Sequence, residues 1–277
     1  MSVTVRLWVM MFLQYAIWGA WSPVLSEYLL TDLGYTGTQV GFIYSLLPLA
    51  TIISPFIGGQ LADRYFSSEK VIAFLQITGG ILLLAAARAT EFSSVAWLMF
   101  LYCLLYAPTL ALTNSIAFIN LKDSEKEFGI VRVGGTIGWI AAGFGLTAWR
   151  VMAKSNPALD IAGDTLLLGG VVSIVMGLFS FVLPHTPPNT SGSESPWAFL
   201  KAFKMLKNPR FAIFMVISFI VSTELMFYYI LTAPFITSDT IGVDVSTVAG
   251  VMAIAQFAEI FVMAVALPFV LPKIGIR

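Results

Sequence analysis

Stretches of apolar residues alternate with short polar segments along nearly the whole chain. A helix of roughly 20 apolar residues is long enough to cross a hydrocarbon core of about 30 Å. Eight stretches are candidates, at residues 6–29, 39–62, 70–88, 93–119, 130–152, 164–184, 210–235 and 246–271. The pattern therefore predicts an all-α polytopic membrane protein. The first stretch is longer than the apolar region of a signal peptide, so we interpret it as a retained helix.

One polar separator is much longer than the others. Residues 185–209 are rich in proline and small polar residues and end in a basic run, which is typical of a linker. A constant shift lays Gly41 on Gly250, so the eighth stretch resembles the second. Six helices, a linker and a restart form the layout of transporters built from two halves. We predict an N-terminal six-helix bundle over 1–184 and the start of a C-terminal bundle over 210–277.

Composition excludes most other classes of protein. Hydrophobic residues make up 58% of the 277 residues and charged residues only 11%, whereas soluble domains average about 25% charged. The formal net charge is zero, so no nucleic-acid partner is expected. A membrane enzyme needs a nucleophile–base pair or a metal cluster, and one cysteine, Cys103, with one histidine, His185, offers neither. We expect no enzyme activity, no metal site and no cofactor.

The basic residues of the predicted loops are distributed unevenly. With a cytoplasmic N-terminus, 11 lysines and arginines lie on the inner side and 3 on the outer side. Cytoplasmic loops carry the excess of Lys and Arg in membrane proteins. The sequence therefore predicts a multi-pass protein of a bacterial inner membrane, with its N-terminus in the cytoplasm.

The strongest local motif follows the second stretch, at Gly58-Gly59-Gln60-Leu61-Ala62-Asp63-Arg64-Tyr65. Small residues such as Gly59 allow a neighbouring helix to approach closely, while Asp63 and Arg64 can cap or pair with adjacent helix ends. We interpret Gly59, Asp63 and Arg64 as a motif that stabilises one closed conformation. The alternative is a solvated turn of chance composition.

Three ionisable residues fall inside predicted spans, Arg132, Glu224 and Glu259. Ionisable groups in a bilayer are expensive and are functional candidates for that reason, here for proton coupling. Arg132 could instead extend its head group to the cytoplasmic interface. For the two glutamates the alternative is a structural hydrogen bond between helices.

Polar and aromatic residues recur at helical spacing in four stretches, so each set lies on one helix face. The sets are Gln14, Trp18 and Trp21; Tyr106, Thr109 and Thr113, with Asn114 beside them; Arg132, Thr136 and Trp139; and Gln256 with Glu259. Amides and carboxylates bind hydroxyl groups while indole or phenol rings stack on a planar solute, as in a polar binding cavity. Alternatively the tryptophans pack between helices or at the membrane interface. The glycines of the fifth stretch, Gly134, Gly135, Gly138 and Gly143, are expected to serve helix packing.

Specific segments resemble known transporters. The motif at residues 58–65 resembles the G-x-L-A-D-R signature of the major facilitator superfamily, from which it departs at Phe66. Within that superfamily the chain resembles the nucleoside:proton symporter family in five segments, which follow one another in the family's order and spacing. The matching segments are residues 12–21, 106–114, 131–138, 183–188 and 255–259.

This resemblance implies proton-coupled transport of nucleosides by alternating access, through a site between two halves. Carried over by position, the site residues are Arg132, Thr136, Trp139, Gln256 and Glu259, and helical spacing adds Gln14 and Asn114. The proton-coupling candidates are Glu259, Glu224 and Arg132. Where the family carries amides, just after Glu224, this chain has Met226 and Tyr229, and Tyr229 completes the candidate substrate site.

The resemblance also sets expectations for the fold and the partners. It implies a major facilitator fold with a complete six-helix half and the first two helices of the second half. Because the family has twelve spans, the chain is expected to be a fragment. The expected partners are a nucleoside-like small molecule and the lipid bilayer, with the proton as coupling ion and a monomeric state. A transporter for a sugar or drug, or a truncated membrane protein that does not transport, remains the alternative.

Overall fold

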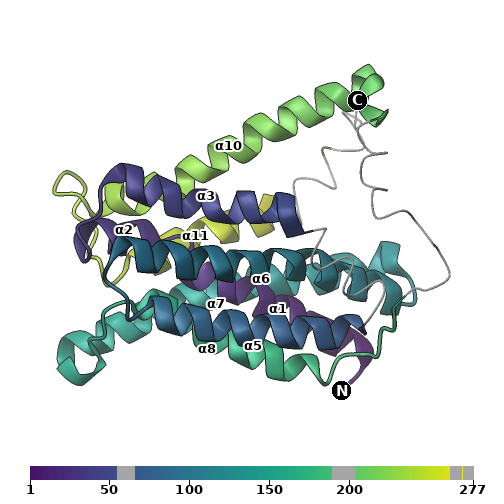
Figure 1. The fold of residues 1–277 in the computed structure, drawn as a ribbon, viewed down its shortest axis with the longest axis horizontal. Coiled ribbons are helices and arrows are strands. Elements are labelled where there is room, and N and C mark those ends of the chain that lie inside the picture. Colours follow the sequence, from purple (N-terminus) through teal and green to yellow (C-terminus); the bar gives the residue numbers. More distant parts are fainter. Residues whose placement is uncertain (55–65, 189–203, 263–269, 271–277) are drawn as a thin grey trace.

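The computed structural model describes residues 1–54, 66–188, 204–262 and 270, and this part of the chain forms helices without strands (Figure 1). The helices of the first bundle are α1 (Val3–Trp21), α2 (Leu25–Thr31), α3 (Gly37–Ser54), α5 (Ser68–Ala86), α6 (Phe92–Asn120), α7 (Ser124–Ser155) and α8 (Asp164–Ser180). The short turn η3 (Lys204–Lys207) precedes α10 (Pro209–Thr237) and α11 (Val248–Phe261), and η2 (Pro157–Leu159) follows α7. Each of the eight predicted spans overlaps at least one of these helices, which confirms the all-α fold.

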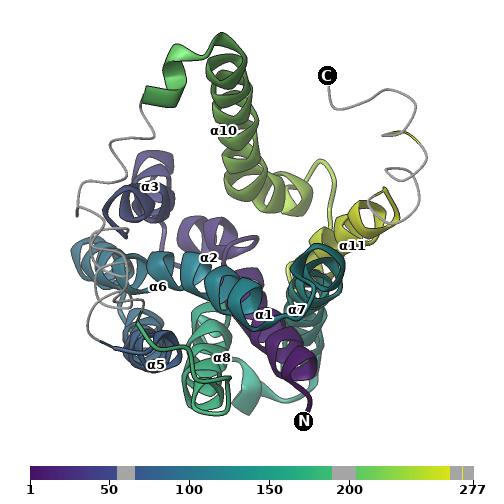
Figure 2. The same cartoon turned by 90° about the vertical axis from the view of Figure 1, so that its right-hand side faces the viewer.

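Six of the described helical segments are long and apolar enough to cross a membrane, and α8 and α11 are shorter apolar helices. In the first bundle α1 packs on α7 and α8, α5 packs on α6 and α8, and α3 packs on α6. Of the second half, α10 contacts α2 and α3, and α11 packs on α7 (Figure 2). The contacts of α10 with α2 and α3 and of α11 with α7 therefore bring the two halves together.

The first predicted span is interrupted rather than continuous. Pro23 lacks a backbone N–H and cannot extend the hydrogen-bond ladder of α1, so the chain turns and restarts as α2. From α3, the Tyr44 hydroxyl donates to the Ser22 carbonyl at 2.7 Å and accepts from the Ser26 N–H at 3.0 Å. These bonds satisfy backbone groups that the break exposes in an apolar interior, which would otherwise be costly.

Glycines bring α7 close to its neighbours. A Cβ atom on Gly134 would lie 2.7 Å from the Trp8 carbonyl oxygen, and one on Gly138 would collide with the Phe12 carbonyl. A Cβ on Gly143 would lie 2.9 Å from the Ala249 carbonyl of α11. Small residues at such contacts let backbones approach where the solvent is lipid. The expectation that these glycines serve helix packing is confirmed.

Candidate functional site

Three aromatic side chains meet where α1, α7 and α10 come together. The ring centroids of Trp18 and Trp139 are 5.5 Å apart, those of Trp139 and Tyr229 are 5.7 Å apart, and those of Trp18 and Tyr229 are 6.2 Å apart. These separations fall in the range of favourable aromatic pairs. Trp139 and Tyr229 are buried. We call Trp18, Trp139 and Tyr229 the aromatic triad, and it joins the first bundle to the second half.

The backbone of α1 makes room for the triad at one position. A Cβ atom on Gly19 would lie 2.9 Å from the Cα of Trp139 and 3.0 Å from its indole ring. Trp139 therefore approaches α1 at a point that a larger side chain would block. The same contact places its ring beside Trp18, one residue earlier in α1.

Arg132 extends this cluster on the α1 side. Its guanidinium lies 4.0 Å from the centroid of the Tyr15 ring, in a cation–π contact, and the Tyr15 ring is 6.4 Å from that of Trp18. A Cβ atom on Gly135 would lie 2.7 Å from both Arg132 Nη1 and the Tyr15 ring, so this glycine accommodates the stack. Thr136, one turn after Arg132, is half-buried.

On the other side α11 contributes Gln256 and Glu259. Glu259 lies close enough to the Tyr229 phenol for its charge to act on that group. Glu259 is exposed and Gln256 half-buried. No ion pair joins Glu259 to Arg132. A series of ring contacts therefore leads from the Arg132 cation through Tyr15 to the aromatic triad.

A cavity of about 210 Å³ adjoins the triad at Trp18. Its other lining residues come from α1, α3, α6 and α10 and include Tyr44, Leu110 and Met226. Ligand pockets usually measure about 300–1,000 Å³. The cavity is therefore smaller than a usual small-molecule site. The family resemblance leads one to expect amides at positions 226 and 229. In this chain Met226 borders the cavity and Tyr229 belongs to the triad.

Gln14 and Asn114 are bonded inside the protein rather than turned to this cavity. The fully buried Gln14 amide donates to Thr109 Oγ1 at 2.8 Å and accepts from Gln76 Nε2 at 2.8 Å. Ser173 Oγ in turn donates to Gln76 Oε1 at 2.7 Å, so this network joins α1, α5, α6 and α8. Asn114 Nδ2 donates to the carbonyl of Leu110 in its own helix. The shared face of Gln14 and Trp18 therefore does not correspond to a shared cavity.

The remaining candidates lie apart from the triad or outside the described residues. Glu224 is exposed on α10, and no ion pair of the described residues includes it. Gly59, Asp63 and Arg64 of the signature motif lie outside the described residues, so their role stays a prediction.

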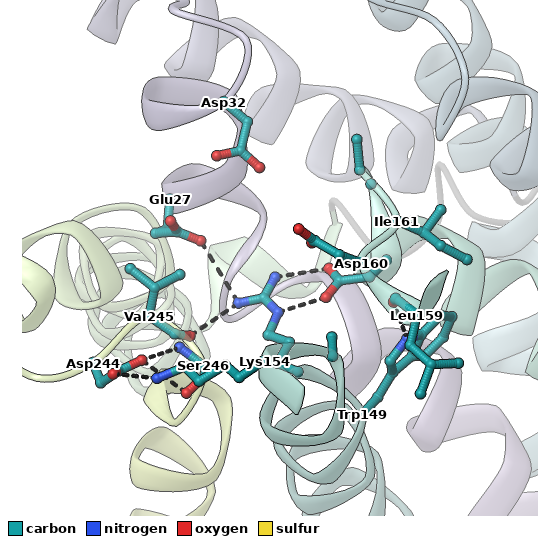
Figure 3. Close-up of a pocket in the computed structure, with 15 residues that line it drawn as sticks. Glu27, Asp32, Trp149, Lys154, Leu159, Asp160, Ile161, Asp244, Val245 and Ser246 are labelled. Atoms are coloured by element: carbon teal, nitrogen blue, oxygen red, sulfur yellow. Dashed lines mark hydrogen bonds and ion pairs between the residues drawn. The ribbon is translucent and has the colours of Figure 1, made fainter. Parts of the chain in front are cut away.

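Sequence reasoning missed a second polar cluster, at the end of the bundle that holds the α7–α8 and α10–α11 loops (Figure 3). Arg150 Nε and Nη2 donate to the two carboxylate oxygens of Asp164 at 2.6 and 2.8 Å. Arg150 Nη1 donates to the Val245 carbonyl at 3.2 Å and lies 3.7 Å from Glu27 Oε2. We call Glu27, Arg150, Asp164 and Val245 the Arg150 cluster. Glu27, an acid inside the first apolar stretch, was the sequence signal for it.

An exposed ion pair borders this cluster. Lys154 Nζ and Asp244 Oδ2 are 2.5 Å apart, and Ser246 also donates to the Asp244 carboxylate. Hydrogen bonds from Lys154 and Ser246 hold the pKa of Asp244 well below its usual range, so this carboxylate stays ionised at neutral pH. These residues and the Arg150 cluster line a cavity of about 320 Å³.

Comparison with known proteins gives a consistent result. A profile of the family described as "Nucleoside H+ symporter" matches residues 1–277. YegT of Escherichia coli (strain K12), named as a nucleoside transporter, is 37% identical over 286 residues, which cover 100% of this chain and 64% of that protein. Nucleoside permease NupG of the same organism is 30% identical over 291 residues, covering 100% of this chain and 67% of NupG. The chain thus spans about two thirds of the length of these relatives.

Solved structures agree with the sequence comparison. A crystal structure of the nucleoside transporter NupG superposes with a TM-score of 0.82 at 28% identity, covering 100% of this chain and 69% of that one. A bacterial homologue of the lysosomal transporter Spinster superposes with a TM-score of 0.72 at 18% identity, over 99% of this chain and 62% of that one. The second likeness supports the fold alone.

Proposed function

Because this chain belongs to the nucleoside H+ symporter family, we propose that it carries nucleosides across a membrane together with protons, by alternating access. The observation that supports this most is the aromatic triad, with Arg132 on one side and Glu259 on the other. A nucleoside has a planar base that can stack on aromatic rings and a sugar whose hydroxyls bind polar groups. The cluster at the junction of the two halves offers both kinds of contact.

The residues divide into roles by their chemistry. Trp139, Trp18 and Tyr229 stack on the base. Arg132 and Thr136 donate hydrogen bonds to oxygen or ring-nitrogen acceptors of the base, and Gln256 and Glu259 bind sugar hydroxyls. Gln14 and Asn114 have no part in it, because their amides are bonded within the protein.

Movement of the two halves is supported by the way α10 meets the first bundle. Its two buried residues, Tyr229 and Ala233, lie in the part of the helix near the α10–α11 loop. Toward Pro209 the helix leans away from α3 (Figure 1). We infer a conformation that is closed at the Arg150 cluster and open at the opposite end, which alternates with the reverse arrangement.

The primary test is uptake of radiolabelled uridine by the full-length protein in proteoliposomes. We expect accumulation above the equilibrium level when the donor side is acidic, and loss of accumulation when a protonophore is added. Unlabelled adenosine should compete, whereas ribose alone should compete poorly because it lacks the base. Competition by maltose but not by adenosine would contradict the nucleoside assignment.

Substitution of Trp139 by alanine tests the triad itself. Loss of one base–aromatic stack costs about 1–3 kcal/mol, which corresponds to roughly 5- to 150-fold weaker binding. We expect the Kd for uridine, measured by isothermal titration calorimetry, to rise within that range. Trp97→Ala is the matched control, because Trp97 lies on α6 and is 66% exposed. Equal affinity in the two variants would remove Trp139 from the site.

We also propose that the N-terminus and η3 face the cytoplasm and that the α7–α8 loop faces outward. Single cysteines at Asp160 and Lys204, both exposed, test this in a Cys103→Ala background. We expect an impermeant maleimide added to intact cells to label position 160 and to spare position 204 until the cells are lysed. The reverse pattern would invert the topology.

A further inference from the structure

Arg150 forms hydrogen bonds with groups of both halves of the protein. Its Nε and Nη2 form a two-bond pair with Asp164, the first residue of α8. Both partners belong to the first bundle, so this pair does not depend on where the second half lies. The Arg150 side chain is only 11% exposed, and a charge so buried requires lasting compensation.

The third nitrogen, Nη1, faces two acceptors. The Val245 carbonyl, in the α10–α11 loop of the second half, is 3.2 Å away and accepts a hydrogen bond. Glu27 Oε2, in α2 of the first bundle, is 3.7 Å away, too far for a good hydrogen bond. In Figure 3 the dashed lines from Glu27 and from Val245 meet at the same nitrogen. Nη1 is therefore bonded across the two halves and only loosely paired within the first.

Glu27 has no charged donor at hydrogen-bond distance in this conformation. Its side chain is 3% exposed, its Oε1 accepts from Thr31 Oγ1 at 2.9 Å, and its Oε2 has the Arg150 ion pair at 3.7 Å. A buried carboxylate gains from a closer charged donor. Glu27 would therefore gain from a shift of Nη1 away from Val245.

Apolar side chains of both halves pack together in the same region. They form a buried cluster of Val24, Leu146, Ala233, Val248, Ala249 and Met252. Apolar packing of this kind is not directional, so it does not select one pairing of polar groups. The hydrogen bond from Arg150 to Val245 is one of the directional contacts that accompany it, together with the Lys154–Asp244 ion pair and the bond from the Gly250 N–H to Thr147 Oγ1.

We propose that Arg150 is the gating residue of this end of the transporter, by exchange of its Nη1 hydrogen bond between Val245 and Glu27. This rests on the proposed alternating access. When the second half is docked, Nη1 binds the Val245 carbonyl. When the α10–α11 loop moves away, Nη1 moves onto Glu27 while Asp164 keeps the other two N–H groups. The buried cation stays compensated in both states, so opening does not leave an unpaired charge.

Double electron–electron resonance between two spin labels can measure this opening without substrate. Ile161 in the α7–α8 loop and Ile241 in the α10–α11 loop are 45% and 50% exposed, lie on different halves and do not belong to the cluster. They are replaced by spin-labelled cysteines in the full-length protein with Cys103→Ala, reconstituted in nanodiscs. The ratio of the long-distance to the short-distance population reports the open state.

The two key variants are expected to move this ratio in opposite directions. Arg150→Gln removes the bond to Val245 and should raise the open population about tenfold, the factor for about 1.4 kcal/mol. Glu27→Gln keeps the shape but removes the negative charge that strengthens the bond from Nη1 in the open state, and should lower the open population about tenfold. The matched control is Asp244→Asn, which breaks an ion pair in the same loop that is 54% exposed. Exposed pairs contribute little, so the ratio should stay within about twofold.

An increase in the open population in both key variants would mean that the cluster only supports folding, and would overturn the exchange. Unchanged ratios would overturn it as well. If Arg150→Gln does not fold, the Glu27→Gln result alone still decides, because only exchange predicts a more closed protein. The distance measurement needs no substrate. If the two variants shift the open population in opposite directions but the protein does not transport nucleosides, the proposed substrate is rejected and the gating role of Arg150 is retained.

Discussion

Replacement of Glu259 by glutamine is expected to abolish uphill accumulation of uridine while leaving exchange of uridine across the membrane intact. Glutamine has the size and hydrogen-bonding capacity of glutamate but cannot bind and release a proton. Glu259 is on α11, next to the aromatic triad through Tyr229, so its protonation can be linked to substrate binding. Linkage of this kind is the minimum requirement for symport.

The measurement compares two assays on the same proteoliposomes. In the variant, acid-driven accumulation should fall to the equilibrium ratio, and counterflow should stay within about threefold of the parent, a change of less than 1 kcal/mol. Glu224→Gln is the comparison, since Glu224 is an exposed glutamate of α10 outside the triad. Uphill uptake by Glu259→Gln would reject the coupling role, and loss of counterflow as well would mean that uridine binding itself requires the charged carboxylate.

Replacement of Gly138 by valine is expected to prevent folding of the first bundle. Overpacking a core usually costs about 1–3 kcal/mol. Here the added Cβ meets the backbone carbonyl of Phe12, which cannot move aside as a side chain can, so the cost should exceed that range. Fluorescence-detected size exclusion should show the loss of the monodisperse peak.

Gly145 provides a control in the same helix. A Cβ atom on Gly145 has no neighbouring atom within 4 Å, so Gly145→Val makes the same change in helix propensity without the collision. It should elute as the parent does and melt within a few degrees of it. If Gly138→Val and Gly145→Val behave alike, Gly138 is not required for the close approach of α1 and α7.

Hydropathy was sufficient to predict the helices because in a membrane the length of an apolar run reports directly on a span. Hydropathy was less informative where a helix continues into polar residues, or where an apolar run contains a break in the helix. The span predicted over residues 130–152 is part of a longer helix, Ser124–Ser155, because polar residues at both ends continue the helix. The break at Pro23 was missed for the opposite reason, because the apolar run continues through it.

Helical spacing identified which residues share a face, but not which neighbour that face meets. It therefore grouped Gln14 with Trp18, although the Gln14 amide binds Gln76 and Thr109 and Trp18 belongs to the triad. Gln76 has no polar residue three or four positions away in its helix and was missed. The Arg150 cluster depends on contacts among α2, α7, α8 and the α10–α11 loop, which a pattern within one helix cannot predict.

The Gln14–Gln76 network has a mechanical consequence. Its hydrogen bonds cross-link α1, α5, α6 and α8 within an apolar interior, where no water competes for the donors. Four helices bonded in this way resist bending, so a tilt imposed at one end of the first bundle must produce an opposite displacement at the other. The bundle would rotate as a rigid body about the level of these amides. Widening of the gap between the two halves at one membrane face would then accompany its narrowing at the other.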